Sequence, residues 1–206
     1  MAASAKPQPI HPLWIRISHW LNALAVLILI ASGWRIYNAA PFFPFTLPNA
    51  LTLGGWLGGA LQWHFAAMWL LAADGLFYLA MNLASGRLAR SFFPVWPRAV
   101  LRDAMDALRG KLAHTDARQY NSVQRLAYLF VMLDLLVLVL SGLVLFKSVQ
   151  FPVLREWLGG YEFSRRIHFV AMGLLVGFIA LHGAMVALVP RTLLTMLSAG
   201  RQGSAA

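Results

Sequence analysis

The sequence of 206 residues contains no cysteine. Disulfide bonds, thiolate-ligated iron–sulfur clusters and c-type haem, which needs a Cys-x-x-Cys-His segment, are therefore excluded. Charge is also scarce, because only 12% of the residues are Asp, Glu, Lys or Arg whereas 60% are hydrophobic. A soluble globular domain is about one quarter charged. These absences predict a membrane protein in which any redox chemistry depends on histidine ligation.

Four long apolar runs account for the hydrophobic composition. They cover about residues 17–36, 62–82, 123–146 and 164–189, and each has about the 20 residues that a membrane-spanning helix needs. The first run is not a cleaved secretory signal in our interpretation, because it continues through Trp34 and has no clear small-residue cleavage site. We therefore expect an all-α integral membrane four-helix bundle, formed by residues 1–206 as a single domain.

Acidic residues are few, so the formal net charge is +10. The distribution of the basic residues along the chain predicts which loops lie on which side of the membrane. Of the 17 Lys and Arg residues, twelve lie in the N-terminal segment, in 87–125 and in the C-terminal segment, and five lie in the other two loops and beside them. The positive-inside rule then places both termini and the 83–122 loop on the cytoplasmic side of the membrane. We expect contact with membrane lipid and no binding of nucleic acid.

The loops add two weaker expectations. From Pro97 to His114, apolar residues recur at helical spacing among Arg and Asp, which predicts a helix. An amphipathic helix on the bilayer surface and an ordinary solvated connector helix both fit this pattern. The two outer loops are rich in Phe, Pro and Trp and offer a docking surface for a partner.

Four histidines lie within the apolar runs, and their depth sorts them into pairs. His168 and His182 are 14 residues apart, so on a helix they leave the same face with a rise of ~21 Å between them. His19 and His64 lie near the starts of the first and second runs, which cross the membrane in opposite directions. Depth therefore pairs His64 with His168 at the outer level and His19 with His182 at the inner level. Because hydrocarbon offers no water to bind, we predict that each pair ligates one haem b iron.

Two glycines agree with this pairing. Gly33 follows His19 by 14 residues, one haem level further out on the same face, and Gly75 follows His64 by 11 residues, at the inner level. A missing side chain lets a flat macrocycle approach the backbone. Close packing of membrane helices by small residues is the alternative explanation.

Basic side chains lie close to the predicted haem levels. Arg16 precedes His19 by about one turn, and Arg165 and Arg166 lie just before His168. They are candidate partners of the anionic haem propionates. Topological charge and binding of lipid headgroups explain the same residues equally well.

The remaining titratable residues are left with open roles. Asp74 and Asp134 are the acids within the runs, and each either has a structural role, protonated or paired, or relays protons to a quinone. His11 and His114 lie outside the runs and are interpreted as ordinary polar residues.

At this point the residues resemble those of the bacterial cytochrome b561-like family. That family includes the membrane cytochrome b subunits of nickel–iron hydrogenases, formate dehydrogenases and thiosulfate-reductase-type enzymes. The resemblance covers about residues 11–197. The matching segments are, in order, Arg16-Ile17-Ser18-His19-Trp20-Leu21-Asn22-Ala23, Gln62-Trp63-His64, Ser85-Gly86-Arg87, Tyr120-Asn121-Ser122-Val123-Gln124, Arg166-Ile167-His168-Phe169 and Leu181-His182.

The resemblance implies a di-haem electron conduit between the quinone pool, as ubiquinone or menaquinone, and a periplasmic redox partner. The chain is most similar to small cytochromes that serve sulfite-oxidase-like molybdoenzymes or thiosulfate reductases. In the family the quinone head binds near the inner haem, beside polar residues that Asn121 and Gln124 match. An amide can donate a hydrogen bond to a quinone carbonyl, although helix capping explains Asn121 as well.

Two other functions stay open on the sequence alone. Small cytochromes of this family include a superoxide oxidase, which passes electrons from superoxide to ubiquinone. In that case Lys147, Arg165 and Arg166 would attract the anion to the outer haem. A haem-free membrane anchor subunit is the other alternative, and an absorption spectrum separates it from both redox functions.

Overall fold

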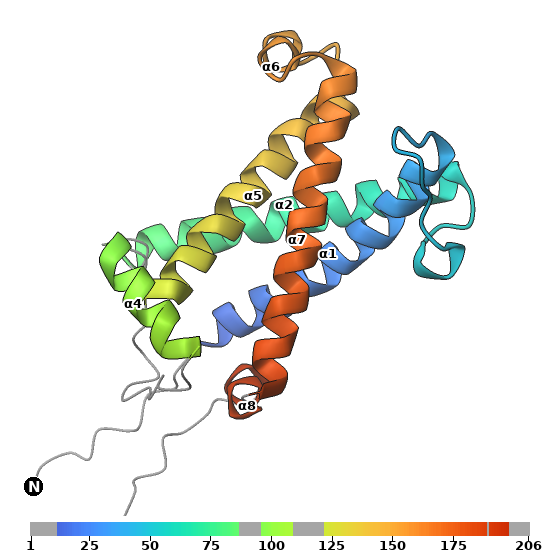
Figure 1. The fold of residues 1–206 in the computed structure, drawn as a ribbon. Coiled ribbons are helices and arrows are strands. Elements are labelled where there is room, and N and C mark those ends of the chain that lie inside the picture. Colours follow the sequence, from blue (N-terminus) through green and yellow to red (C-terminus); the bar gives the residue numbers. More distant parts are fainter. Residues whose placement is uncertain (1–11, 87–95, 109–121, 189, 198–206) are drawn as a thin grey trace, which may run out of the picture. The chain divides into compact units, whose positions relative to one another are not determined.

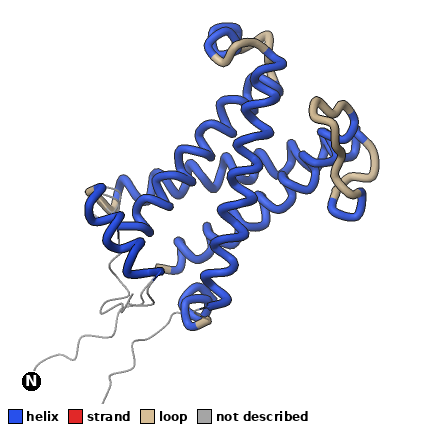
Figure 2. Tube along the Cα trace, in the orientation of Figure 1, coloured by secondary structure: helices blue, strands red, loops and turns tan. Residues whose placement is uncertain are grey.

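The computed structural model describes residues 12–86, 96–108, 122–188 and 190–197. These residues form helices joined by loops and turns, with no strand among them (Figures 1 and 2). Four of the helices are long and apolar enough to cross a membrane, which confirms the predicted all-α membrane protein: α1 (Leu13–Ala39), α2 (Leu57–Ala84), α5 (Ser122–Phe146) and α7 (Tyr161–Leu188). The chain divides into two compact units, Met1–Gly86 with Arg191–Ala206 and Arg87–Pro190.

All four membrane helices begin before the apolar runs that predicted them. The helix α1 starts at Leu13 and α2 at Leu57, whereas the runs start at residues 17 and 62. Helical hydrogen bonding continues through the aromatic and polar residues of a membrane interface, where an average of hydropathy already falls. The cytoplasmic placement of the termini stays a prediction from charge.

In the first unit, α1 and α2 form an antiparallel hairpin (Figure 1). Small side chains such as Ala25 and Ala60 are completely buried, and small residues allow membrane helices to approach closely. Near the start of α1, Ser18 Oγ donates a 2.6 Å hydrogen bond to Asp74 Oδ2 of α2. This contact fixes the register of the two helices and satisfies a buried carboxylate.

The connection between α1 and α2 is tied to the end of α1 by side-chain hydrogen bonds. The Tyr37 hydroxyl donates to the Phe45 carbonyl at 2.8 Å. The Asn38 amide donates to the Leu47 carbonyl and accepts from the Leu47 N–H, both at 2.8 Å. These contacts hold the proline-containing connection against α1, and the connection contains the short 3₁₀ helix η1 (Asn49–Leu51).

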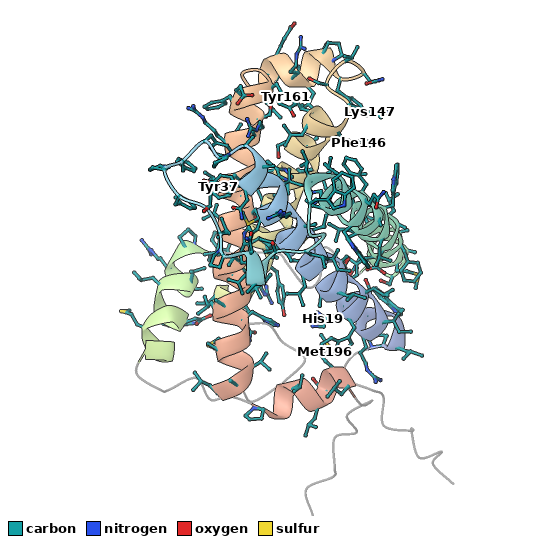
Figure 3. All side chains as sticks on the ribbon, turned by 90° about the vertical axis from the view of Figure 1, so that its right-hand side faces the viewer. His19, Tyr37, Phe146, Lys147, Tyr161 and Met196 are labelled. Atoms are coloured by element: carbon teal, nitrogen blue, oxygen red, sulfur yellow. The ribbon has the colours of Figure 1, made fainter. Side chains whose placement is uncertain are left out.

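The helix α8 (Arg191–Leu197) belongs to the first unit and was not predicted. Arg16 Nε donates to the Met196 carbonyl at 3.1 Å, and the same guanidinium also donates to the Leu197 carbonyl. The last carbonyls of a helix have no partner within the helix, so a cation placed there satisfies them and interacts favourably with the helix dipole. Figure 3 shows Met196 at the same end of the unit as His19, whose neighbour Trp20 also donates to the Met196 carbonyl.

In the second unit, α5 packs along α7, and the short helix α6 (Pro152–Trp157) lies in the connection between them (Figure 1). Phe146 and Lys147 at the end of α5 lie near Tyr161 at the start of α7 (Figure 3). The chain enters α7 through Gly159 and Gly160, whose φ angles of +75° and +92° favour glycine. This tight entry places α7 antiparallel to α5.

The helix α4 (Pro97–Leu108) confirms that the long loop contains a helix, while residues 109–114 of the predicted range lie outside the described residues. Asp103 Oδ2 accepts a 2.8 Å hydrogen bond from the N–H of Ser122, the first residue of α5. That N–H has no partner within its own helix, so Asp103 caps α5 from a neighbouring helix. The same hydrogen bond lowers the pKa of the Asp103 carboxyl.

We expect Asp103→Ala to destabilise the α4–α5 junction by about 1 kcal/mol, the usual effect of losing a helix cap. Because the folded pKa is lowered, this stabilisation is complete above the unfolded pKa of about 3.9 and disappears as pH falls through the lower folded value. Hydrogen exchange in the first turn of α5 measures the effect at pH 7 and below pH 4. Asp106→Ala, on the same helix, is the control. Equal exchange in the two variants at pH 7 would contradict the capping role.

Candidate functional site

In the first unit, the imidazole of His64 on α2 lies against Ser32 and Gly33 of α1. Ser32 is completely buried, and its Oγ lies 2.6 Å from the Ile28 carbonyl and 3.0 Å from His64 Nδ1. A hydroxyl has one proton and a carbonyl only accepts, so the short contact shows that Ser32 donates to the backbone. The Ser32 oxygen then offers only lone pairs to the ring, and the backbone carbonyl of Leu29 is a second acceptor for a ring N–H of His64. Donation through Nδ1 leaves the lone pair of the neutral imidazole on Nε2.

The second unit contains the same arrangement around His168 of α7. Ser141 of α5 is completely buried, and its Oγ lies 2.6 Å from the Val137 carbonyl and 3.0 Å from His168 Nδ1. By the same reasoning, the Nδ1–H of His168 can donate to Ser141, which leaves the lone pair on Nε2. In each unit, a buried serine oxygen thus lies 3.0 Å from Nδ1 of one histidine and can accept its proton.

A glycine lies under each of these two rings. A Cβ added to Gly33 would lie 3.5 Å from His64 Cε1, and a Cβ added to Gly142 would lie 3.2 Å from His168 Cε1. The first distance is an ordinary van der Waals contact, whereas the second is tighter than most Cβ contacts. The missing side chain therefore matters most at Gly142, where it lets the His168 ring approach α5 closely, whereas the space at Gly33 would accept a Cβ.

At the other end of the first unit, the α1–α2 hairpin brings His19 and Gly75 to the same level. Ser18 precedes His19 and bonds Asp74, which precedes Gly75. A Cβ added to Gly75 would meet nothing within 4 Å in the described part of the chain. Asp74 is thereby paired with a hydroxyl, close to a predicted ligand.

In the second unit, His182 lies on α7 fourteen residues after His168. The two side chains therefore leave the same face of the helix. The His182 ring stacks on Phe178, one turn earlier, with centroids 6.0 Å apart and planes 9° from parallel. The helix α7 thus carries two candidate ligands at two depths.

The predicted propionate partners lie at helix ends. Arg16 binds the end of α8, as described above, and Arg165 forms a 2.9 Å ion pair with Glu162. Arg166 is exposed near the start of α7. Contact between these side chains and haem stays a prediction.

The predicted quinone residues are only partly described. Gln124 is half-buried in the first turn of α5, whereas Asn121 lies outside the described residues. Further along α5, the buried Asp134 Oδ2 has no hydrogen-bond partner within the described ranges. The cap on the first N–H of α5 comes from Asp103, a residue to which the sequence pattern had given no role.

The donor chemistry of His64 and His168 fits haem. An axial ligand offers one imidazole nitrogen to the iron, while its other ring N–H donates to an acceptor that sets the tautomer and orientation. Each hairpin supplies that acceptor, together with a glycine under the ring. The described residues gather no cluster of three or more His, Asp or Glu side chains around a common point. A macrocycle that brings four nitrogens of its own requires only the two axial ligands from the protein.

Sequence reasoning identified the histidines and Gly33 but missed Ser32, Ser141 and Gly142. The available signal was an internal repeat: the dipeptide Ser-Gly occurs near the end of the first and third apolar runs, and a histidine follows each time near the start of the next run. A comparison of the two halves of the chain would have found it.

Comparison with known proteins gives a consistent result. The family model of prokaryotic cytochrome b561 matches residues 10–199. A protein of Azospira oryzae named as a protein-methionine-sulfoxide reductase subunit, YedZ1, is 64% identical over 188 residues, which cover 91% of this chain and 95% of the relative. A protein of Cupriavidus necator named as a Ni/Fe-hydrogenase B-type cytochrome subunit is 26% identical over 196 residues, or 87% of this chain and 78% of the relative.

Proposed function

Since the chain belongs to the prokaryotic cytochrome b561 family, and is thus a multi-pass electron-transfer protein of the bacterial inner membrane that binds haem b, we propose that it holds two such haems. We further propose that it passes electrons from membrane quinol to a periplasmic molybdoenzyme that reduces methionine sulfoxide. In this proposal residues 1–206 act as one membrane cytochrome b domain. The observation that carries it is the pair of histidines, one in each unit, whose Nδ1 lies 3.0 Å from the oxygen of a buried serine.

The assignment of ligands follows from depth along the four helices. His64 and His168 lie near the starts of α2 and α7, and we assign both to the outer haem. His19 lies near the start of α1 and His182 near the end of α7, and we assign both to the inner haem. Bound haem b supplies a one-electron couple between ferrous and ferric iron.

The inner level carries the groups that a quinone site needs. Quinol oxidation releases two electrons and two protons, so the site requires hydrogen-bond donors and a proton acceptor. The Gln124 amide can donate to the quinone oxygen, and Asp74, paired with Ser18, can accept a proton at the level of His19. Two basic groups, Arg16 and Arg125, lie in the first turns of α1 and α5.

The name of the Azospira relative, a subunit of a methionine-sulfoxide reductase, supports electron flow from quinol toward such a reductase. Reduction of methionine sulfoxide to methionine consumes two electrons and two protons and releases water. Oxidation of one quinol supplies two electrons, so one quinol balances one sulfoxide. The ordered loop around Tyr37 and Asn38 and the exposed residues of α6 lie on the predicted outer side, where such a partner would dock.

The test is reoxidation of quinol-reduced haem in vesicles that contain the full chain. We expect the reduced α-band to disappear after addition of a purified periplasmic methionine-sulfoxide reductase together with methionine sulfoxide, and to persist when either is added alone. Reoxidation by the sulfoxide without the reductase would contradict the conduit. A protein without any dithionite-reduced α-band would be a haem-free anchor.

The superoxide oxidase alternative has its own readout in the same vesicles. Potassium superoxide would then reduce the haem directly and form quinol, without any periplasmic protein. Of the basic side chains that this alternative requires, Arg165 is paired with Glu162, and Lys147 lies over the ring of Phe146. Rapid haem reduction by superoxide, with no response to the reductase, would decide for this alternative.

A further inference from the structure

The two units contain a duplicated contact between a buried serine and a histidine of the next membrane helix. In both, the serine hydroxyl donates to the carbonyl four residues earlier at 2.6 Å, and the imidazole Nδ1 lies 3.0 Å from the same oxygen. In both, the residue after the serine is the glycine under the ring. Three matching features in two separate units indicate one common role.

We propose that Ser32 and Ser141 are positioning residues, which hold His64 and His168 as Nδ1-protonated imidazoles and direct Nε2 to haem iron. This inference rests on the proposed haem ligation and adds the groups that control it. Neither serine touches the haem in this proposal, because each acts through its histidine.

The backbone fixes the role of each hydroxyl. A serine with its proton committed to a carbonyl of its own helix offers only lone pairs to the ring. The ring must then donate through Nδ1, which excludes the tautomer with a proton on Nε2, the one that cannot bind a metal through that nitrogen. Because both serines are completely buried, water does not compete for these contacts.

The acceptor also tunes the iron. A hydrogen bond accepted from Nδ1–H raises the basicity of the ligating nitrogen, which favours ferric over ferrous iron. Removal of the serine oxygen should therefore raise the reduction potential of the haem that the histidine ligates. It should also loosen the ring, since the hydrogen bond restricts its rotation.

The experiment compares Ser32→Ala and Ser141→Ala in the full haem-loaded chain, by redox titration and by low-temperature EPR of the ferric low-spin signals. We expect each variant to raise the potential and shift the EPR signal of the same one of the two haems, with ~10-fold weaker retention of that haem. The two variants lie in different units, so either one is informative if the other fails to accumulate. Unchanged potentials and EPR signals in both would overturn the proposal.

Ser164→Ala is the matched control. Ser164 is also completely buried on a membrane helix and donates to the carbonyl four residues earlier, that of Gly160, at 2.8 Å. The Ser164→Ala substitution removes a buried hydroxyl that is not part of a serine–imidazole pair. The reduction potentials of both haems should therefore stay at their original values. An equal shift in Ser164→Ala would show a general packing effect and refute the positioning role.

Ser32→Thr and Ser141→Thr test the same point by rescue. Threonine keeps the hydroxyl and can also bond the carbonyl four residues earlier, so the potential and EPR signal should return toward those of the original chain. Failure of the proposed function gives a different result, because a chain that binds no haem has neither signal. Haem that is present but insensitive to both serines contradicts only this inference.

Discussion

Replacement of His168 by alanine is expected to reduce the haem content of the chain from two to one. In the proposed assignment the imidazole would be one of the two protein ligands of the outer haem iron, and alanine has no atom that could replace it. The inner haem should remain, because its proposed ligands are His19 and His182. The pyridine haemochrome assay measures haem per chain, and EPR shows which of the two ferric signals is lost.

The pairing of histidines by depth also predicts that two different variants lose the same haem. His64→Ala should remove the same EPR signal as His168→Ala, and the double variant should lose no more haem than either single one. His114→Ala, outside the apolar runs, serves as the control and should keep both haems. Loss of different signals in the two single variants would contradict the pairing, and loss of neither haem would refute the ligand assignment.

The second large effect is expected at Gly142. A Cβ at this position already lies 3.2 Å from His168 Cε1, and the two methyl groups of a valine would extend further into the ring. The ring cannot move away without breaking its 3.0 Å contact with Ser141. Overpacking of this kind costs about 1–3 kcal/mol, which corresponds to ~5- to 150-fold weaker binding of the outer haem.

Two matched variants separate this effect from a general one. Gly177→Val makes the same change on α7, half a turn out of phase with His168, where a Cβ would meet nothing within 4 Å in the described part of the chain. Gly33→Ala should be tolerated, because its Cβ would make an ordinary 3.5 Å contact with His64. Equal haem loss in Gly142→Val and Gly177→Val, measured by haemochrome assay and thermal release of haem, would show that the contact with His168 is not the cause.

Much of the fold followed from the sequence because hydropathy is a local property. A run of about 20 apolar residues must form a helix in hydrocarbon, where every backbone N–H and C=O needs a partner within the segment. The histidines were recognisable for the same reason, since a polar ring at membrane depth requires a partner. Helix ends were less accurate, as α2 shows by starting at Leu57, because hydrogen bonding continues where hydropathy falls.

The contacts between elements could not be predicted in the same way. The periodicity of α1 places Ser18 and Ser32 on the helix surface, but which residues of α2 lie opposite depends on the axial register of the hairpin. Likewise, Arg16 was a candidate partner of a haem propionate, and its hydrogen bond to a carbonyl at the end of α8 involves a helix that the sequence did not predict. Asp103 had no assigned role until its contact with Ser122 was seen.

The sequence by itself determined a membrane protein with four helices and four histidines at two depths, because helical pitch and the cost of burying polar groups act along a single segment. The tertiary structure alone placed a buried serine oxygen 3.0 Å from Nδ1 of His64 and of His168. Each serine lies in a different helix from its histidine, so the contact forms only when the helices pack.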